Sequence, residues 1–417
     1  MILKWILSTC VCLIFVTTST WVPTNQVEFL RRFTRPFEFD YFGWTLRAAG
    51  SKGALQSLGI VHHLNDNQQR KIINDYFKIQ SNINQINEEI EAIYADPEIA
   101  NPDEGSLQLR TKLDQLTEWQ QGQAILAEAV LQDQISQVLH DMDLTELGLP
   151  FPPVLYHVTQ LPRELVVSPR DAIRQEASVS LSDTITIDEI ELLEQDVEEN
   201  TDFSALVVTV GGIGTYPTMV ISSTDLARLI ETVAHEWIHN ALIFKPLGIR
   251  YDLSAELRTM NETTASIAGK EISRAVMQRY YAIERTKQYP LYDTVMIGIF
   301  QNEDNPDQPF DFQKEMYQTR LKVDELLGEE KIDEAEQYME DRRALFWENG
   351  YRIRKLNQAY FAFHGAYADK SFSAAGDDPV GADVRLLRKR SGSLSQFYRR
   401  ISRMTSYDDL KEFLNSY

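Results

Sequence analysis

Cysteine is almost absent from this chain of 417 residues: it has two, Cys10 and Cys12, and both lie within the first 22 residues. The rest of the chain can therefore form no disulfide and offers no thiolate to a metal. Apolar residues make up 43% of the sequence, which is enough for a large hydrophobic core. The stability of the folded part is therefore expected to come from that core.

Positive charge is also scarce, because 41 basic residues face 62 acidic ones and the formal net charge is −21. This balance argues against a nucleic acid as partner. An acidic surface mainly aids solubility, although it also favours a basic peptide or an amine terminus. A basic run near the C-terminus opposes the trend and is typical of a solvated helix face, with contact to lipid headgroups or a substrate carboxylate as the alternative. It comprises Arg385, Arg388, Lys389, Arg390, Arg399, Arg400 and Arg403.

Histidine occurs seven times, and two of the seven lie in the pentapeptide His235-Glu236-Trp237-Ile238-His239, which reads HExxH. On a helix, residues four apart lie on one face, so both imidazoles can reach one metal ion. Two neutral nitrogen ligands suit Zn²⁺, and the carboxylate of Glu236 is placed to take a proton from the attacking water. The motif predicts a zinc site in which His235 and His239 are ligands and Glu236 is the general base.

The flanking sequence predicts the helix that this motif needs. Residues 222–225 offer hydroxyl N-caps, and Ser222 with Asp225 fits a capping box. Pro246 and Gly248 are expected to end the helix. The alternative is a helix that carries two incidental histidines. A buried stripe at helical spacing is predicted from Leu226, Leu229, Ile230, Val233, Trp237 and Ala241.

A catalytic zinc site needs a third protein ligand. The downstream acids are Asp252, Glu256, Glu262 and Glu271. Glu262 is favoured because 23 residues past His239 leave room for one helix to end and a second to begin, with Asn261-Glu262 at its start. Glu256 is the alternative, and in the favoured interpretation it only caps or decorates the loop.

With these residues the chain resembles the gluzincin metallopeptidases, the group that includes thermolysin. Their pattern is HExxH followed by a glutamate on the next helix, often preceded by asparagine, and His235, Glu236, His239, Asn261 and Glu262 match it. The resemblance implies that His235, His239 and Glu262 bind zinc. The chain departs from the pattern at Ser266, where thermolysin-like enzymes have an aspartate that orients a ligand histidine, so the support around the metal is weaker than in the family.

The C-terminal half is similar to a narrower group, bacterial membrane-associated aminopeptidase-like proteins. The similarity rests on residues 356–400, above all on the segment from Leu356 to Tyr367 and on Leu394-Ser395-Gln396-Phe397-Tyr398. Aminopeptidase activity is what this resemblance implies.

The first 22 residues form a membrane or export signal. Lys4 precedes an apolar stretch from Trp5 to Val22 that suits either a signal anchor or a signal peptide. We expect an uncleaved anchor with the catalytic domain outside the cytoplasm. Cleavage of the segment and secretion are the alternative.

Residues 23–150 are expected to be a helical region, with two antiparallel helices within 65–147, and residues 151–417 a zincin-like catalytic domain with a C-terminal helical part. In that domain, 205–210 and 218–221 read as a hairpin just before the HExxH helix, and 311–349 as a helical hairpin that turns near Gly328. The predicted fold class is α+β, mainly α, with a small antiparallel sheet before the active-site helix and long helical hairpins.

A hydrogen-bond donor to the developing oxyanion is sought in the segment 356–367. Asn357, Tyr360, His364 and Tyr367 recur there at spacings of three and four, which places them on one helix face. Tyr367 or His364 is the candidate donor. The alternative is a polar network that is satisfied within the core.

Together these features predict a zinc-dependent, aminopeptidase-like peptidase that acts on a peptide substrate. The alternative from another class is a membrane-anchored helical scaffold whose metal site is structural or vestigial. A zinc hydrolase that acts on a non-peptide amide is a second alternative. Oligomeric state, and exo- against endopeptidase action, do not follow from the sequence.

Overall fold

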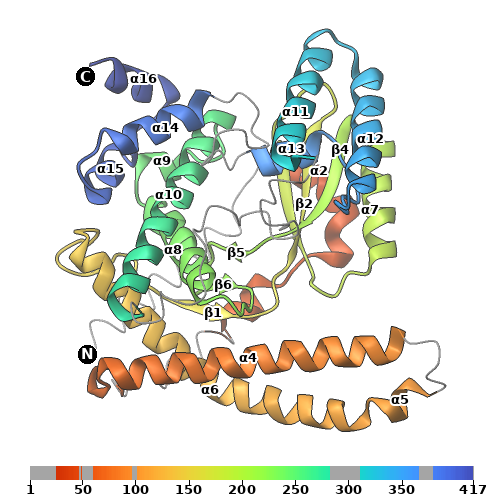
Figure 1. The fold of residues 1–417 in the computed structure, drawn as a ribbon. Coiled ribbons are helices and arrows are strands. Elements are labelled where there is room, and N and C mark those ends of the chain that lie inside the picture. Colours follow the sequence, from red (N-terminus) through yellow and green to blue (C-terminus); the bar gives the residue numbers. More distant parts are fainter. Residues whose placement is uncertain are drawn as a thin grey trace.

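The computed structural model describes residues 25–46, 48, 60–95, 101–281, 310–365 and 379–416. The described chain is mainly helical and has two three-stranded sheets, so the predicted α+β, mainly α class is confirmed (Figure 1). Two lobes flank the middle of the molecule. One is built of helices, and the other is a sheet covered by helices on both faces.

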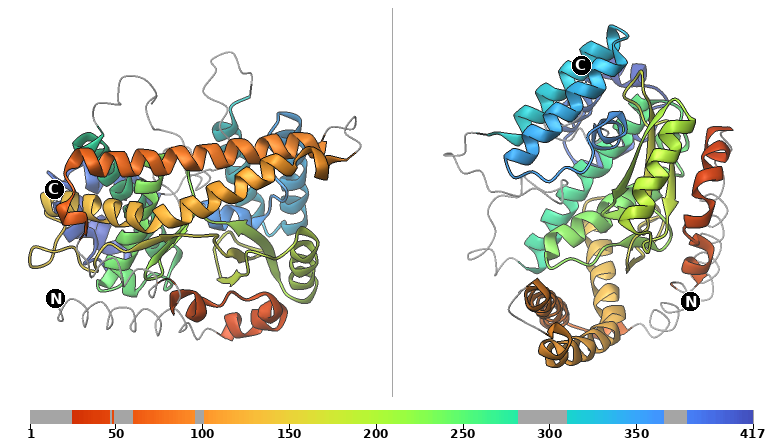
Figure 2. Two further views of the ribbon diagram at one scale, coloured as in Figure 1. Left: turned by 90° about the horizontal axis from the view of Figure 1, so that it is seen from below. Right: turned by 90° about the vertical axis from the view of Figure 1, so that its right-hand side faces the viewer.

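The expected N-terminal helical pair is present as α4 (Asp66–Ala95) and α6 (Leu107–Asp141), joined through the short α5 (Pro102–Gly105). Figures 1 and 2 show the two long helices running side by side in opposite directions. The amide of Gln134 on α6 donates to Gln69 on α4 over 3.2 Å. The pair is therefore fastened by buried polar contacts as well as by apolar packing.

The helical lobe has one core, and that core crosses the boundary expected at residue 150. Buried side chains of α6, such as Val130 and Ile135, pack in the same cluster as those of the HExxH helix. The second half of α6 therefore shares a core with the HExxH helix rather than belonging to a separate helical region. The other helices of this lobe are α8 (Leu226–Leu242), α9 (Pro246–Ile249), α10 (Ala255–Tyr280), α14 (Pro379–Lys389), α15 (Leu394–Ile401) and α16 (Tyr407–Asn415).

Helices α8 and α10 lie against each other closely. At Gly269 of α10, an added Cβ would come within 2.9 Å of the Glu231 carbonyl oxygen and 3.3 Å of the His235 Cβ. Only a residue without a side chain permits this approach. The approach brings α10 to the helix that carries both histidines.

The ends of these helices differ from the prediction. Asp225, rather than a hydroxyl residue, caps α8, and its Oδ1 accepts a hydrogen bond from the Arg228 amide over 3.1 Å. Helix α8 already ends at Leu242, and Pro246 instead opens α9. Helix α10 begins at Ala255 behind the N-cap Ser254, so Glu262 lies well inside the helix and not at its start.

The predicted hairpin of 205–210 with 218–221 is wrong. Strand β4 (Phe203–Thr209) pairs antiparallel with β2 (Arg163–Pro169), and β2 pairs antiparallel with β3 (Ala177–Leu181). The physical reason is that β4 is apolar on both faces, with Ala205 and Val207 in one core and Leu206 and Val208 in another. Such a strand is most stable inside a layered sheet.

A second, smaller sheet has the strand order β1-β6-β5, formed by β1 (Tyr156–Val158), β6 (Thr218–Val220) and β5 (Gly212–Ile213). Strands β1 and β6 are parallel, whereas β5 and β6 are antiparallel. The expectation of one antiparallel sheet therefore holds only for β3-β2-β4. Strand β5 is an edge strand of the small sheet.

Helices cover both faces of the β3-β2-β4 sheet (Figure 2). On one face lie α2 (Asn25–Thr34) and α7 (Ile187–Asn200), which pack on Leu165 and Val167. The other face carries α11 (Phe312–Gly328), α12 (Ile332–Glu348) and α13 (Gln358–Gly365). The helical hairpin predicted to turn near Gly328 is confirmed. Two 3-10 turns, η1 (Arg35–Phe37) and η2 (Ile60–His63), complete the described elements.

Much of the C-terminal basic run takes part in packing. Arg388 of α14 forms a two-pronged ion pair with Glu271 of α10 at 2.7 and 2.8 Å, and Arg399 pairs with Asp143 at 2.7 Å. Arg390 donates to the Leu414 carbonyl oxygen. These contacts fasten the last three helices to the helical lobe.

Within the described ranges, no helix combines the length and the apolar character that a membrane span requires. The predicted signal segment, residues 1–22, lies outside the described residues.

Candidate metal centre

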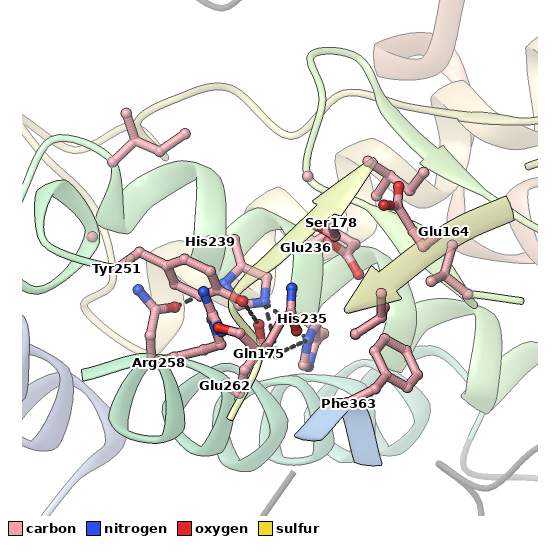
Figure 3. A pocket seen from close by; sticks show the side chains of 18 residues that line it. Glu164, Gln175, Ser178, His235, Glu236, His239, Tyr251, Arg258, Glu262 and Phe363 are labelled. Atoms are coloured by element: carbon pink, nitrogen blue, oxygen red, sulfur yellow. Dashed lines mark hydrogen bonds and ion pairs between the residues drawn. The ribbon is translucent and has the colours of Figure 1, made fainter. Parts of the chain in front are cut away.

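The three predicted ligands come together between α8 and α10 (Figure 3). The Nε2 atoms of His235 and His239 are 3.0 Å apart. Oε2 of Glu262 lies 3.5 Å from Nε2 of His235 and 3.4 Å from Nε2 of His239. One ligand atom from each residue falls within a 4.8 Å cluster, which is the size of a single coordination site.

The cluster fits a divalent cation. Oε2 of Glu262 is buried without a hydrogen bond from the described residues, and the two histidine rings at 3.4 and 3.5 Å are the cationic partners that offset the cost of burying its charge. Burial disfavours the charged forms of both His239 and Glu262, but their mutual attraction outweighs it. The attraction between the two side chains raises the pKa of His239 to about 9 and holds the pKa of Glu262 well below its usual range. A metal ion supplies the positive charge that a proton on His239 otherwise provides, and the set of two histidines and one glutamate suits Zn²⁺.

Two neighbouring side chains orient the ligands. Nδ1 of His239 lies 2.8 Å from Oδ1 of Asn261, so the ring donates there and Nε2 is the nitrogen that faces the cluster. The Tyr251 hydroxyl donates to Oε1 of Glu262 over 2.5 Å, which leaves Oε2 facing the histidines. Asn261 thus orients a histidine, the role for which position 266 was considered. The Ser266 hydroxyl is buried without a partner among the described residues.

The sequence interpretation missed Tyr251. It precedes the helix that bears Glu262 by only a few residues, but no spacing rule links a loop tyrosine to a glutamate eleven positions later. The predicted competitor Glu256 lies exposed in the first turn of α10, outside the cluster.

Glu236 lies beside the cluster and against β5. A Cβ added to Gly212 would come within 2.8 Å of the Glu236 Cγ and 2.9 Å of its Oε1, so a side chain at 212 would displace this carboxylate. Burial raises the pKa of Glu236, and the charges of His235 and His239 oppose that rise. A carboxyl with a raised pKa beside a metal site is suited to accept and return a proton.

The cluster opens into a cavity of about 360 Å³ that lies between the two lobes (Figure 3). Helices α8 and α10 form one wall, with the metal ligands and Glu236. The other wall is part of one face of the β3-β2-β4 sheet, where Glu164, Val166 and Ser178 line the cavity. The volume suits a small ligand or a few residues of peptide.

The structure describes one of the two predicted oxyanion donors, and it does not place that one in the cavity wall. Tyr367 lies outside the described residues. His364 is not among the residues that line the cavity, and its ring packs on those of Tyr360 and Phe363, with centroids 4.3 and 5.0 Å apart. Phe363 is the α13 residue in the cavity wall.

The polar face of α13 instead attaches the helix to the sheet. Asn357 accepts a hydrogen bond from the Tyr360 amide and donates one to the Ala205 carbonyl oxygen, both over 3.0 Å. Burial of His364 lowers its pKa to about 4, so the ring is neutral near pH 7. For Asn357 these contacts agree with the alternative considered from the sequence, a polar network satisfied within the core.

Comparisons with protein-family models, with curated proteins and with solved structures found no match to this chain.

Proposed function

We propose that this protein is a zinc-dependent peptidase whose metal is held by His235, His239 and Glu262. The convergence of their three ligand atoms in a buried site, with a carboxyl beside them, carries the proposal. A purely structural zinc site has four protein ligands, whereas the cluster offers three among the described residues, together with the potential base Glu236. This difference favours catalysis over the scaffold alternative.

Zn²⁺ bound here would supply an activated water and polarise the substrate carbonyl. Glu236 would take the proton of the attacking water and deliver it to the leaving amine. Arg258 lines the cavity on the side of the metal ligands, and its Nε–H, which has no partner among the described residues, is a donor available to the developing oxyanion.

The peptide backbone has a natural partner in β5. Among the described residues this strand pairs only with β6, and Gly212, Ile213 and Gly214 line the cavity next to Glu236. An extended substrate could add to that edge as a further strand. A non-peptide amide lacks the extended backbone that could pair with this strand edge. Profiling with peptide and non-peptide amides therefore separates a peptidase from another zinc hydrolase.

The placement of the protein is part of the proposal. Residues 1–22 would tether the peptidase to a membrane with the catalytic domain outside the cytoplasm, or would be removed on secretion. Alkaline carbonate extraction of membranes separates the two, because only a tethered protein stays in the pellet.

The first test is the zinc content of the purified full-length protein beside Glu262→Ala and Glu256→Ala. We expect one zinc per chain in the wild type and in Glu256→Ala, whose side chain is exposed, and a loss in Glu262→Ala. The zinc-loaded wild type should hydrolyse unblocked peptides. Absence of zinc from the wild type, even after metal addition at neutral pH, would favour the scaffold.

A further inference from the structure

The cavity contains a carboxyl that belongs neither to the metal cluster nor to an ion pair of the described residues. Glu164 of β2 lines the wall opposite α8 and α10. The cavity's other cationic or anionic groups outside the HExxH cluster are already paired: Arg258 contacts Asp252 and the Gln175 carbonyl oxygen, each over 2.9 Å. Glu164 is therefore the charged lining group that remains available to a ligand.

A hydroxyl relay holds Glu164 in place. Ser180 lies directly across from it on β3, and the Ser180 hydroxyl donates to Oε1 of Glu164. The Tyr41 hydroxyl in turn donates to Ser180 over 2.7 Å. The relay engages Oε1, and no described residue donates to Oε2.

Sheet register directs this carboxyl toward the cavity. Glu164 pairs with Ser180, and Val166 pairs with Ser178, so these four side chains share one face of the sheet. Glu164, Val166 and Ser178 line the cavity. Figure 3 places Glu164 on the side away from Tyr251 and Arg258, with the metal cluster between them.

We infer that Glu164 binds the free α-ammonium of the substrate, so that the protein acts on peptides with an unblocked N-terminus. The inference rests on the proposed peptidase function and specifies its substrate class. An ammonium is the small cation that a peptide brings, and a carboxylate on the far wall would set its distance from the metal. An N-terminal residue held between Glu164 and the cluster would present its own carbonyl to the metal site and to the water that Glu236 deprotonates, which would make the reaction an aminopeptidase reaction.

The electrostatics of Glu164 agree with this role. Burial raises its pKa to about 7, although the Ser180 hydrogen bond opposes the rise. Ionising this group without a cation nearby is therefore unfavourable. A bound ammonium would stabilise the carboxylate, so the site is complete only when a cation occupies it.

A measurement of peptide binding tests the role of Glu164 independently of peptide cleavage. Calorimetry with full-length, zinc-loaded Glu236→Gln compares Leu-Gly-Gly with acetyl-Leu-Gly-Gly, because this variant should hold peptide without cleaving it. We expect the free tripeptide to bind at least about tenfold more tightly, and the added substitution Glu164→Gln to remove that preference by weakening only the free peptide, about 10- to 100-fold. Glutamine still accepts the Ser180 hydrogen bond, which preserves the fold, and Glu164→Asp should restore part of the preference.

Glu176→Gln is the matched control, because it removes the same charge from the sheet lobe at a residue that pairs with Arg174 and does not line the cavity. It should keep the preference for the free peptide. Equal binding of the free and acetylated peptides, or an equal loss in Glu164→Gln and Glu176→Gln, would overturn the inference and leave the peptidase proposal standing. If neither peptide binds and the wild type cleaves neither, both proposals fail.

Discussion

The two walls of the cavity are built in different ways. On the helical wall, His235, Glu236 and His239 come from one turn of α8, and one close helix contact adds Glu262. On the sheet wall, Glu164 is set by the pairing of separate strands and by a relay that starts at Tyr41, more than a hundred residues away. The proposed metal site thus lies on local, rigid structure, whereas the proposed recognition of the substrate amine depends on long-range strand pairing.

The electrostatics of the walls differ as well. The charges of the helical wall hold one another, which keeps Glu262 ionised in spite of its burial. Burial raises the pKa of Glu164, because the Ser180 hydrogen bond opposes the rise only in part and no opposite charge among the described residues offsets it. The helical wall therefore suits the metal that we propose, and the sheet wall suits the proposed cationic group of the substrate.

The largest expected effect is the loss of the base on the helical wall. Glu236→Gln should lower kcat by about 10²- to 10⁴-fold, because general-base catalysis is removed while the ligands are untouched. Zinc content by plasma mass spectrometry and the melting temperature should match those of the wild type. A variant that keeps its full rate would show that Glu236 is not the base.

An intermediate effect should follow from the loss of ligand orientation on the same wall. Asn261→Ala removes the partner of His239 Nδ1 and should weaken zinc binding by about 10- to 100-fold. Competition with a zinc-specific chromophoric chelator measures this. Ser266→Ala is the control and should leave the affinity unchanged, since the Ser266 hydroxyl has no partner among the described residues. A larger loss of zinc affinity in Ser266→Ala than in Asn261→Ala would show that Ser266, and not Asn261, supports the zinc ligands.

The smallest effect concerns the packing behind the sheet wall. His364 has a folded pKa of about 4, below the unfolded value of about 6.5. Because the unfolded chain binds the extra proton, the neutral ring contributes stability that is complete above pH 6.5 and is lost as pH falls toward 4. The loss should be about 1–2 kcal/mol after allowance for the ring's partial exposure.

Urea unfolding of the zinc-saturated protein between pH 4 and 7.5 measures this loss. His364→Gln should be less sensitive to acid than the wild type over that window, whereas His140→Gln, a substitution of an exposed histidine, should not differ from the wild type. Activity loss in His364→Gln without a change in acid stability would return His364 to the list of catalytic candidates.

Several features were predictable because they are local. The helix of HExxH, the helical pairs of 65–147 and 311–349, and the α+β, mainly α class follow from periodicity and end signals that lie within each segment. Glu262 was favoured over Glu256 on spacing and motif, and it is the acid that joins the cluster. The helix ends were less predictable, because Asp225, Ser222 and Ser223 all have the chemistry of a cap.

Other features were hidden because they depend on strand partners. The apolar run 205–208 shows that a buried strand exists, but not that β2 rather than β6 lies beside it. Tyr251 is a loop residue whose contact with Glu262 depends on where α10 begins. The sequence shows the polar spacing from Asn357 to His364. That spacing is compatible with residues that attach α13 to the sheet as well as with an oxyanion donor, so it does not distinguish the two roles.

By itself the sequence determined the metal-binding helix, since four-residue spacing on one helix is enough to bring two histidines together. Only the tertiary structure decided what faces that helix. The approach at Gly269 set the third ligand in place, and strand register aimed Glu164 into the same cavity. The physical reason is that helical geometry is fixed by neighbours along the chain, whereas a cavity is defined by surfaces that meet only after distant segments have packed.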